Sequence, residues 1–184
     1  YVPLTTMQSG LAASTMGHPA DQRDPYHVQA IFTLSGAVDA AAMAAAWAHC
    51  CQTFEALRLR VFSLARGDLI GYLGDLDALQ VTTLTAPKEV VTPRQWLKET
   101  DFEEPFRMDG SPLVRVILLS VDDNASILLV SHHHLVMDGW SFQVVMKAFG
   151  DAYPQCAEQG RPVCDSQLPA LTWRQYLDQL APTT

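Results

Sequence analysis

The stretch ASILLVSHHHLVMDGWS, residues 125–141, decides how the rest of the sequence is interpreted. Its first nine residues are mostly apolar and predict a buried strand, and residues 140–153 carry the pattern of a helix. Three consecutive histidines end the strand, and the tight loop LVMDG separates them from the helix, with Gly139 permitting a backbone angle that other residues resist. Because histidine has the unperturbed pKa nearest to neutrality, this corner is a candidate for proton chemistry.

Taken on the residues alone, the histidine run has three interpretations. In the first, the histidines are hydrogen-bonded structural residues and Asp138 caps the helix. A metal site is the second, but His132 and His134 face one side of a strand and His133 the other, and the sequence offers no second cluster of ligands. In the third, one imidazole moves or orients a proton while Asp138 holds the local structure. The residues do not separate the first interpretation from the third.

Outward from this stretch, helices and strands alternate without a strict rhythm. Residues 112–121 and 125–133 are predicted to form the centre of a mixed sheet, and the fold class is α/β (α+β), a two-layer sandwich of a mixed sheet covered by helices. The other predicted elements are helices at 3–15, 39–54, 92–100 and 172–180, and strands at 26–36, 57–64 and around 69–73.

Side-chain patterns refine three of these elements. Thr92 with Gln95, and Thr172 with Gln175, have the spacing of a capping box, in which each residue satisfies a backbone N–H of the other at a helix start. In the strand at 57–64, leucines and a valine alternate with arginines, which predicts that the arginines lie on its polar side.

Composition limits the classes of protein that the chain can belong to. At 184 residues it has the length of one domain, and 48% of its residues are hydrophobic, as in folded proteins. A net charge of -8 without basic runs argues against a nucleic-acid partner. We also expect no membrane span, no signal peptide and reduced cysteines, hence a cytoplasmic location. Since the chain starts at Tyr1 rather than Met, we expect it to be a piece of a longer protein.

Five stretches resemble, in order, the core motifs of the condensation domains of nonribosomal peptide synthetases, a branch of the chloramphenicol acetyltransferase-like superfamily. The segment from His133 to Gly139 reproduces the superfamily signature His-His-x-x-x-Asp-Gly, and Trp-Ser follows as is usual in the family. The other matching stretches are PLTTMQSGL (3–11), FEALRLRVF (54–62), FRMDGSPLVRVILL (106–119) and TWRQYL (172–177). Because the matches cover nearly the whole chain, the resemblance is more specific than the signature alone.

The resemblance also has departures. Family members consist of two similar lobes with the signature at the end of the first, so residues 1–184 are expected to form the N-terminal lobe alone, without the C-terminal lobe. Thr53, Phe54 and Glu55 stand where the second motif usually has Arg-His-Glu. The first motif is more similar to that of domains that accept a donor in the D configuration or act on both configurations, and we expect the D-donor type.

The family reaction assigns roles to five residues. In it, the amine of a carrier-bound aminoacyl thioester attacks a carrier-bound donor thioester and forms an amide bond. The resemblance implies that His134 is the catalytic histidine, either as a general base or by orienting the amine. His133 is expected to serve packing. Asp138 is expected to be buried and paired with Arg58, and Gly139 to let the substrate tether approach the backbone.

The resemblance further implies the partners of this lobe. They are peptidyl or acyl carrier protein domains, the C-terminal lobe and an adjacent adenylation domain. The substrates are carried on 4'-phosphopantetheine, and we expect no cofactor and no metal bound by this lobe, which should be inactive when isolated. The alternatives are a one-lobe or trimeric coenzyme A-dependent acyltransferase and a non-catalytic module that docks carrier proteins.

Overall fold

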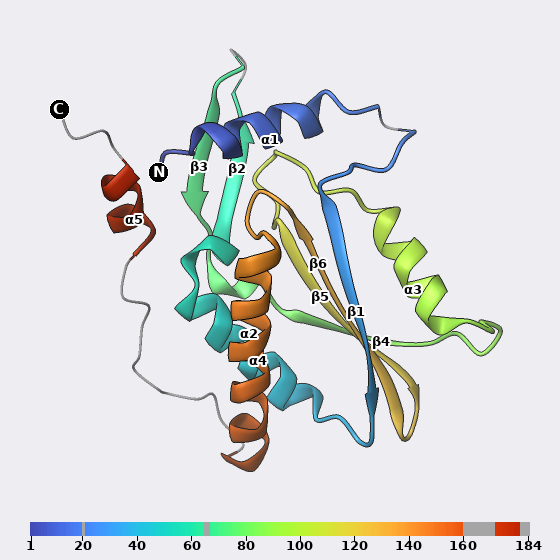
Figure 1. Ribbon diagram of the computed structural model, residues 1–184. Helices are drawn as coiled ribbons and strands as arrows, with labels where there is room; N and C mark the ends of the chain where they lie inside the picture. Colours follow the sequence, from blue (N-terminus) through green and yellow to red (C-terminus); the bar gives the residue numbers. More distant parts are fainter. Residues whose placement is uncertain (20, 65–66, 160–171, 181–184) are drawn as a thin grey trace.

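A four-stranded mixed sheet forms the centre of the protein in the computed structural model, which describes residues 1–19, 21–64, 67–159 and 172–180. Its strands are ordered β1-β6-β5-β4, with β6 antiparallel to both neighbours and β4 parallel to β5 (Figure 1). This confirms the predicted mixed sheet with residues 112–121 and 125–133 at its centre. The strands are β1 (His27–Ser35), β4 (Val81–Thr85), β5 (Val114–Asp122) and β6 (Ala125–His133).

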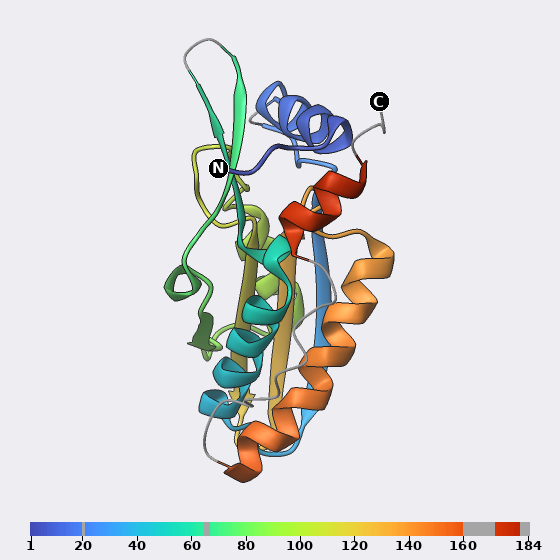
Figure 2. The ribbon, with the colours of Figure 1, turned by 90° about the vertical axis from the view of Figure 1, so that its left-hand side faces the viewer.

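Helices cover the sheet on both faces (Figure 2). The helices α2 (Ala40–Thr53) and α4 (Gly139–Gln159) lie side by side on one face, and α3 (Pro93–Phe102) lies on the other. Alternate residues of β6 supply the two cores: Leu128 and Val130 join the cluster of α2 and α4, and Ile127 and Leu129 join that of α3. Because both faces of the strand are buried, its sequence is continuously apolar rather than alternating.

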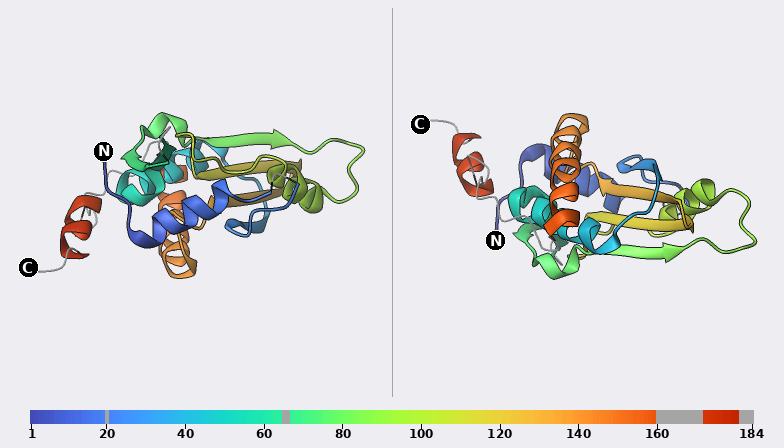
Figure 3. Two further views of the ribbon diagram at one scale, coloured as in Figure 1. Left: turned by 90° about the horizontal axis from the view of Figure 1, so that it is seen from above. Right: turned by 90° about the horizontal axis from the view of Figure 1, so that it is seen from below.

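A third core lies at the end of the sheet where β6 stops. The helix α1 (Thr6–Met16) crosses this end beside the hairpin of β2 (Leu59–Ser63) and β3 (Leu69–Leu73) (Figures 1 and 3). Ala12 of α1, Leu59 of β2 and Leu135 after the histidines are all buried in one cluster. The histidine corner is therefore packed between α1, the hairpin and the sheet.

Helix starts follow the sequence patterns with one exception. The capping boxes of Thr5 with Gln8 and of Thr172 with Gln175 both form, the second at the start of α5 (Trp173–Leu180). At α3 the predicted box is wrong, because Thr92 makes no side-chain cap and the amide of Gln95 instead donates to Glu99 one turn later.

Two further elements differ from the sequence-based expectation. The strand β4 was not predicted, because its sequence VTTLT is short and three of its five residues are polar threonines. Helix α4 runs past 153 and through Pro154, since Ala152 and Cys156 keep its apolar face buried on both sides of the proline. The residues around Pro162 and Pro169, whose prolines predict a linker before the last helix, lie outside the described residues.

The arginines of the second motif lie differently from the prediction. Residues 55–58 form a 3-10 turn rather than strand, so Arg58 precedes β2. Arg60 is only 2% exposed, although the alternation placed it on a polar side. Gly74 leaves room for it, because a Cβ there would lie 2.5 Å from the Arg60 Nε atom. Burial lowers the pKa of Arg60.

The cysteines of the described residues are free and buried. Burial is the main cause that raises the pKa of Cys50 and of Cys51 to about 12. Both thiols are therefore protonated at neutral pH and poor nucleophiles. Cys164 lies outside the described residues.

Candidate active site

The candidate site is the end of β6, where the backbone of the histidine run is held from both sides. The amide N–H of His133 donates to the carbonyl of Leu113 at 2.9 Å, and that of His134 donates to the carbonyl of Tyr26 at 2.8 Å. Leu113 immediately precedes β5, and Tyr26 immediately precedes β1. These two hydrogen bonds therefore fix the backbone position of both histidines.

His132 is buried on the face of α4. The residue is 3% exposed, and its ring stacks on the ring of Phe142, with centroids 5.7 Å apart and an interplanar angle of 21°. Burial lowers its pKa to about 4, so the ring is neutral at pH 7. These contacts make His132 a packing residue of the core beneath α4.

His133 points to the opposite face and is completely buried. Its Nδ1 atom accepts a hydrogen bond from the amide of Leu135 at 3.0 Å, so the proton of the neutral ring is on Nε2. The Nε2 atom lies 2.8 Å from Thr15 Oγ1, and the ring of Phe106 meets it edge-on. Burial lowers the pKa of His133 to about 4, against an opposing effect of Asp24.

His134 is the exposed member of the three. It follows β6 by one residue, so its backbone is fixed by Tyr26 while its ring faces solvent. The structure therefore separates two adjacent histidines by environment: His133 is enclosed and held in one tautomer, and His134 presents its ring to whatever occupies the surface beside it.

Asp138 and Gly139 form the turn from the histidines into α4. One oxygen of the exposed Asp138 carboxylate, Oδ1, accepts hydrogen bonds from the amides of Trp140 and Ser141 and from the Ser141 hydroxyl. The bonds from Ser141 are the main reason that the pKa of Asp138 lies below its usual range. This arrangement is a helix N-cap, one of the alternatives that the sequence left open.

The expected burial of Asp138 and its pairing with Arg58 are wrong in this structure. Arg58 makes its ion pair with Glu55, three residues earlier, with 3.6 Å between Nη2 and Oε1. The physical reason is local: the start of α4 supplies Asp138 with backbone donors, and the 3-10 turn brings Glu55 beside Arg58. Within the described part of the chain, no ion pair joins Asp138 to Arg58.

Gly139 is the first residue of α4 and does not have a positive φ angle. The expectation that the loop needs a backbone angle special to glycine is therefore wrong. A Cβ added at Gly139 would have no heavy atom within 4 Å, so the space beside this backbone is open. The absence of a side chain here keeps the surface free next to the histidine loop.

A buried polar network that sequence reasoning missed lies between the sheet and α3. Asp101 of α3 accepts from the side chains of Gln29 and Arg115, and its Oδ2 atom lies 2.8 Å from Nε2 of His27. The same Nε2 atom lies 2.8 Å from the Ser131 hydroxyl. Burial opposes ionisation of Asp101, but these hydrogen bonds and the charge of Arg115 outweigh it and lower its pKa.

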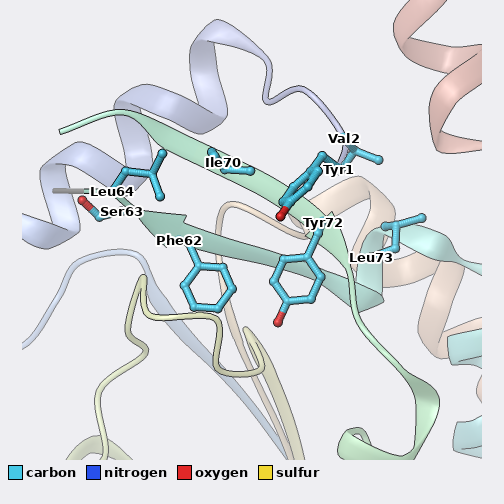
Figure 4. A pocket seen from close by; sticks show the side chains of 8 residues that line it. All are labelled: Tyr1, Val2, Phe62, Ser63, Leu64, Ile70, Tyr72 and Leu73. Atoms are coloured by element: carbon cyan, nitrogen blue, oxygen red, sulfur yellow. The ribbon is translucent and has the colours of Figure 1, made fainter. Parts of the chain in front are cut away.

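One hollow lies beside the site, and another lies on the β2–β3 hairpin. One, of about 460 Å³, lies beside His133 and is lined by Thr15, Asp24, Phe106 and others. The other, of about 690 Å³, lies on the hairpin, where Phe62 and Tyr72 stack with ring centroids 5.4 Å apart (Figure 4). The Phe62 ring covers the backbone of Gly110, so the hairpin is fixed to the loop before β5.

Two further properties concern ligands and membranes. Among the described ranges, no three His, Cys, Asp or Glu side chains gather so as to hold a metal ion. In the same part of the chain, no helix has the length and apolar character needed to cross a membrane.

The family model described as Condensation domain matches residues 1–182, and the chain therefore belongs to the condensation-domain family. Malpinin synthetase of Mortierella alpina is 30% identical over 145 residues, which are 76% of this chain and 2% of that protein. A nonribosomal peptide synthetase of Emericella nidulans is 32% identical over 161 residues, 83% of this chain and 6% of that protein. The chain thus spans a small part of each relative.

Solved structures give the same fold. The X-domain from teicoplanin biosynthesis matches with a TM-score of 0.80 and 22% identity, over 96% of this chain and 37% of that one. The starter condensation domain of rhizomide synthetase matches with a TM-score of 0.74 and 19% identity, over 89% of this chain and 39% of that one. These likenesses confirm the predicted mixed sheet with helices, although helices on both faces give three layers rather than the two that were expected.

Proposed function

We propose that residues 1–184 are the N-terminal lobe of a condensation domain that forms a peptide bond, with His134 as its catalytic histidine. Three observations support the proposal: the family match over residues 1–182, the coverage of 37% and 39% of the two solved chains, and the exposure of the second histidine of the signature. The last of these carries the assignment of the residue.

In the proposed reaction, the amine nitrogen of the acceptor attacks the carbonyl carbon of the donor thioester. The C–N bond forms, the C–S bond breaks, and the electron pair leaves with the sulfur of the donor's phosphopantetheine arm. The attacking nitrogen loses one proton, which restores the thiol of the leaving arm. A thioester is already activated, so the protein has to place the two arms and manage this proton.

His134 suits that task because of how the two adjacent histidines differ. Its backbone is fixed by the sheet, so the exposed ring starts from a defined position. His133 is enclosed and its Nδ1 atom is already occupied by Leu135, so it supports the corner rather than meeting substrate. His134 then accepts the proton of the amine or orients the amine by a hydrogen bond.

The partners follow from the same proposal. Two carrier protein domains present the phosphopantetheine arms, the C-terminal lobe supplies the other wall of the channel, and an adenylation domain loads the acceptor. The names of the two relatives, both synthetases, support this setting. We further propose a cytoplasmic location and a donor in the D configuration.

The decisive experiment replaces His134 in a two-lobe condensation domain that contains this chain. His134→Ala should lower kcat for amide formation between two loaded carriers by about 10²–10⁴-fold, with carrier binding unchanged. His49→Ala, at a half-buried histidine on α2, is the matched control and should keep the rate. A kcat within about threefold of wild type in His134→Ala would rule out the proposed role, since a proton-transferring imidazole contributes far more.

A second variant separates the two chemical roles of His134. Asparagine can donate and accept hydrogen bonds but does not accept a proton near neutral pH. If His134 acts as a base, His134→Asn should be as slow as His134→Ala. If it orients the amine, His134→Asn should recover about tenfold or more over His134→Ala in the same assay.

The open space beside Gly139 gives an independent test of where the tether passes. Gly139→Ala adds a methyl group that meets no protein atom within 4 Å, so the fold should keep its stability. If a substrate arm runs along this backbone, the variant should raise KM for the loaded carriers. Unchanged KM and kcat would place the arm elsewhere.

The isolated chain should form no amide from two loaded carriers, because a single lobe offers only part of the surface that positions them. Product formation by the 184-residue chain, lost in His134→Ala, would contradict this and favour a one-lobe acyltransferase.

A further inference from the structure

The loop between α1 and β1 contains an aspartate that belongs to none of the sequence motifs, Asp24. Its side chain is only 8% exposed, although the loop lies at the surface. One oxygen, Oδ1, accepts a hydrogen bond from the amide of Tyr26 at 2.8 Å. The other, Oδ2, is buried without a hydrogen-bond partner and lies 3.7 Å from Nε2 of His133.

The first oxygen links Asp24 to the exposed histidine. An aspartate that accepts from the amide two residues later forms an Asx turn, which fixes the backbone between them. Here the fixed residue is Tyr26, whose carbonyl accepts the amide N–H of His134 at 2.8 Å. The chain of contacts from Asp24 to His134 therefore contains two short hydrogen bonds and no flexible side chain beyond that of Asp24.

The second oxygen faces the buried histidine. Because Leu135 donates to Nδ1 of His133, the ring proton is on Nε2 and points toward Thr15 Oγ1 and the Asp24 carboxylate. A carboxylate on that side favours this tautomer electrostatically, and an amide N–H₂ group in its place would oppose it. Both oxygens of Asp24 thus act on the histidine pair, one through the backbone and one through the ring.

We infer that Asp24 is a positioning residue for His134, and this inference depends on the proposed function. Asp24 touches neither substrate nor the reacting atoms. It holds Tyr26 so that the amide of His134 stays hydrogen-bonded at the end of the sheet. It also keeps the ring of His133 in its buried orientation. A small displacement of a catalytic group costs up to about 10²-fold in rate, which sets the size of the expected effect.

The test combines a local readout on the 184-residue chain with kinetics of the two-lobe domain. In Asp24→Ala, hydrogen exchange of the His134 amide should become at least about tenfold faster, while that of the Val130 amide within β6 is unchanged. kcat should fall about 10- to 100-fold with KM for the loaded carriers unchanged. Asp24→Asn keeps the acceptor for Tyr26 but places an amide N–H₂ group beside His133, so it should recover His134 protection and only part of the lost kcat. Asp21→Ala, an exposed aspartate of the same loop, is the control and should match wild type.

Each outcome decides the inference. Wild-type exchange at His134 in Asp24→Ala would overturn it, whatever the fate of the proposed function, because that readout needs no activity. A loss of protection across all of β6 would also overturn it, since that is a general loss of stability. If Asp24→Ala does not fold, Asp24→Ser replaces it, because serine forms a weaker turn of the same kind. That variant should show a partial loss of both quantities, and wild-type values in it would contradict the inference.

Discussion

Two aspartates of this chain, Asp101 and Asp138, are both held in the ionised form but by different surroundings. The side chain of Asp101 is completely buried, and its partners come from β1 and β5. Asp138 is exposed, and every hydrogen bond that its side chain accepts comes from within three residues. Asp138, which belongs to the signature, therefore finds all its hydrogen-bond donors nearby in sequence. Asp101, which belongs to no motif, connects distant parts of the fold.

The largest effect is expected where Asp101 is removed. Asp101→Ala leaves Arg115 and His27 without their shared partner, and breaking a buried ion pair in this way costs about 3–5 kcal/mol of unfolding free energy. Urea denaturation of the variant and wild type measures the difference. Glu104→Ala, at an exposed carboxylate just after α3, is the control and should stay within about 0.5 kcal/mol. A similar small loss in Asp101→Ala would show that the network is not important for stability.

The next effect is a loss of stability in mild acid, and it comes from the histidines. His132 and His133 have pKa values lowered to about 4 in the folded chain, against about 6.5 when unfolded. The unfolded state therefore binds more protons between these values, and stability falls as pH drops through this window. Between pH 7 and pH 5.5 the two together should cost roughly 2–3 kcal/mol.

Denaturation at several pH values measures the loss of stability in this window and distinguishes it from the contribution of Asp101. The pKa of Asp101 is lowered in the folded state, so its stabilisation is complete above about pH 4 and is lost only below it. Replacing one histidine, as in His132→Asn, should reduce the slope between pH 7 and pH 5.5 by about half. An unchanged slope would mean that other groups cause the loss.

These two regions also show which parts of the fold could be predicted from sequence. Local rules placed β6 and both flanking helices, because continuous apolar residues and caps such as Asp39 act within a few positions. The same rules missed β4, whose pairing with β5 depends on residues some 35 positions later, and they wrongly predicted a capping box at α3. The failed capping box shows that a short range in sequence was necessary for these predictions but did not guarantee them.

In the site, too, some features could be predicted from the sequence and others could not. The alternation along a strand predicted that His132 and His133 face opposite sides, and the structure places them against Phe142 and Phe106 respectively. The partner of Arg58 was mispredicted because the pairing with Asp138 was transferred from a family pattern, whereas the observed partner, Glu55, lies only three residues earlier. Asp24 was missed because its contact with His133 spans about 110 residues of sequence.

A smaller effect is expected at Asp138, whose cap can be tested alone. Asp138→Ala removes the acceptor for Trp140 and Ser141 and should cost about 1 kcal/mol, the usual loss for an N-cap. Asp138→Asn keeps an equivalent acceptor and should cost only about a few tenths of a kcal/mol. Thermal denaturation distinguishes the two variants. A loss of about 3 kcal/mol or more in either would indicate a buried partner and favour the motif-based pairing.

The smallest expected quantity is the coupling between Arg58 and Asp138, and it decides between the family pattern and the observed contacts. In a double-mutant cycle of Arg58→Ala and Asp138→Ala, two residues that share no partner should be additive within about 0.5 kcal/mol. The cycle of Arg58→Ala and Glu55→Ala is the matched comparison, because that pair is 3.6 Å apart and each side chain is about a quarter exposed. Its coupling should be about 0.2–1 kcal/mol, the range for exposed ion pairs. A coupling above about 1 kcal/mol in the first cycle would mean that Asp138 and Arg58 pair in solution, and that the cap at α4 is the weaker of two alternative arrangements.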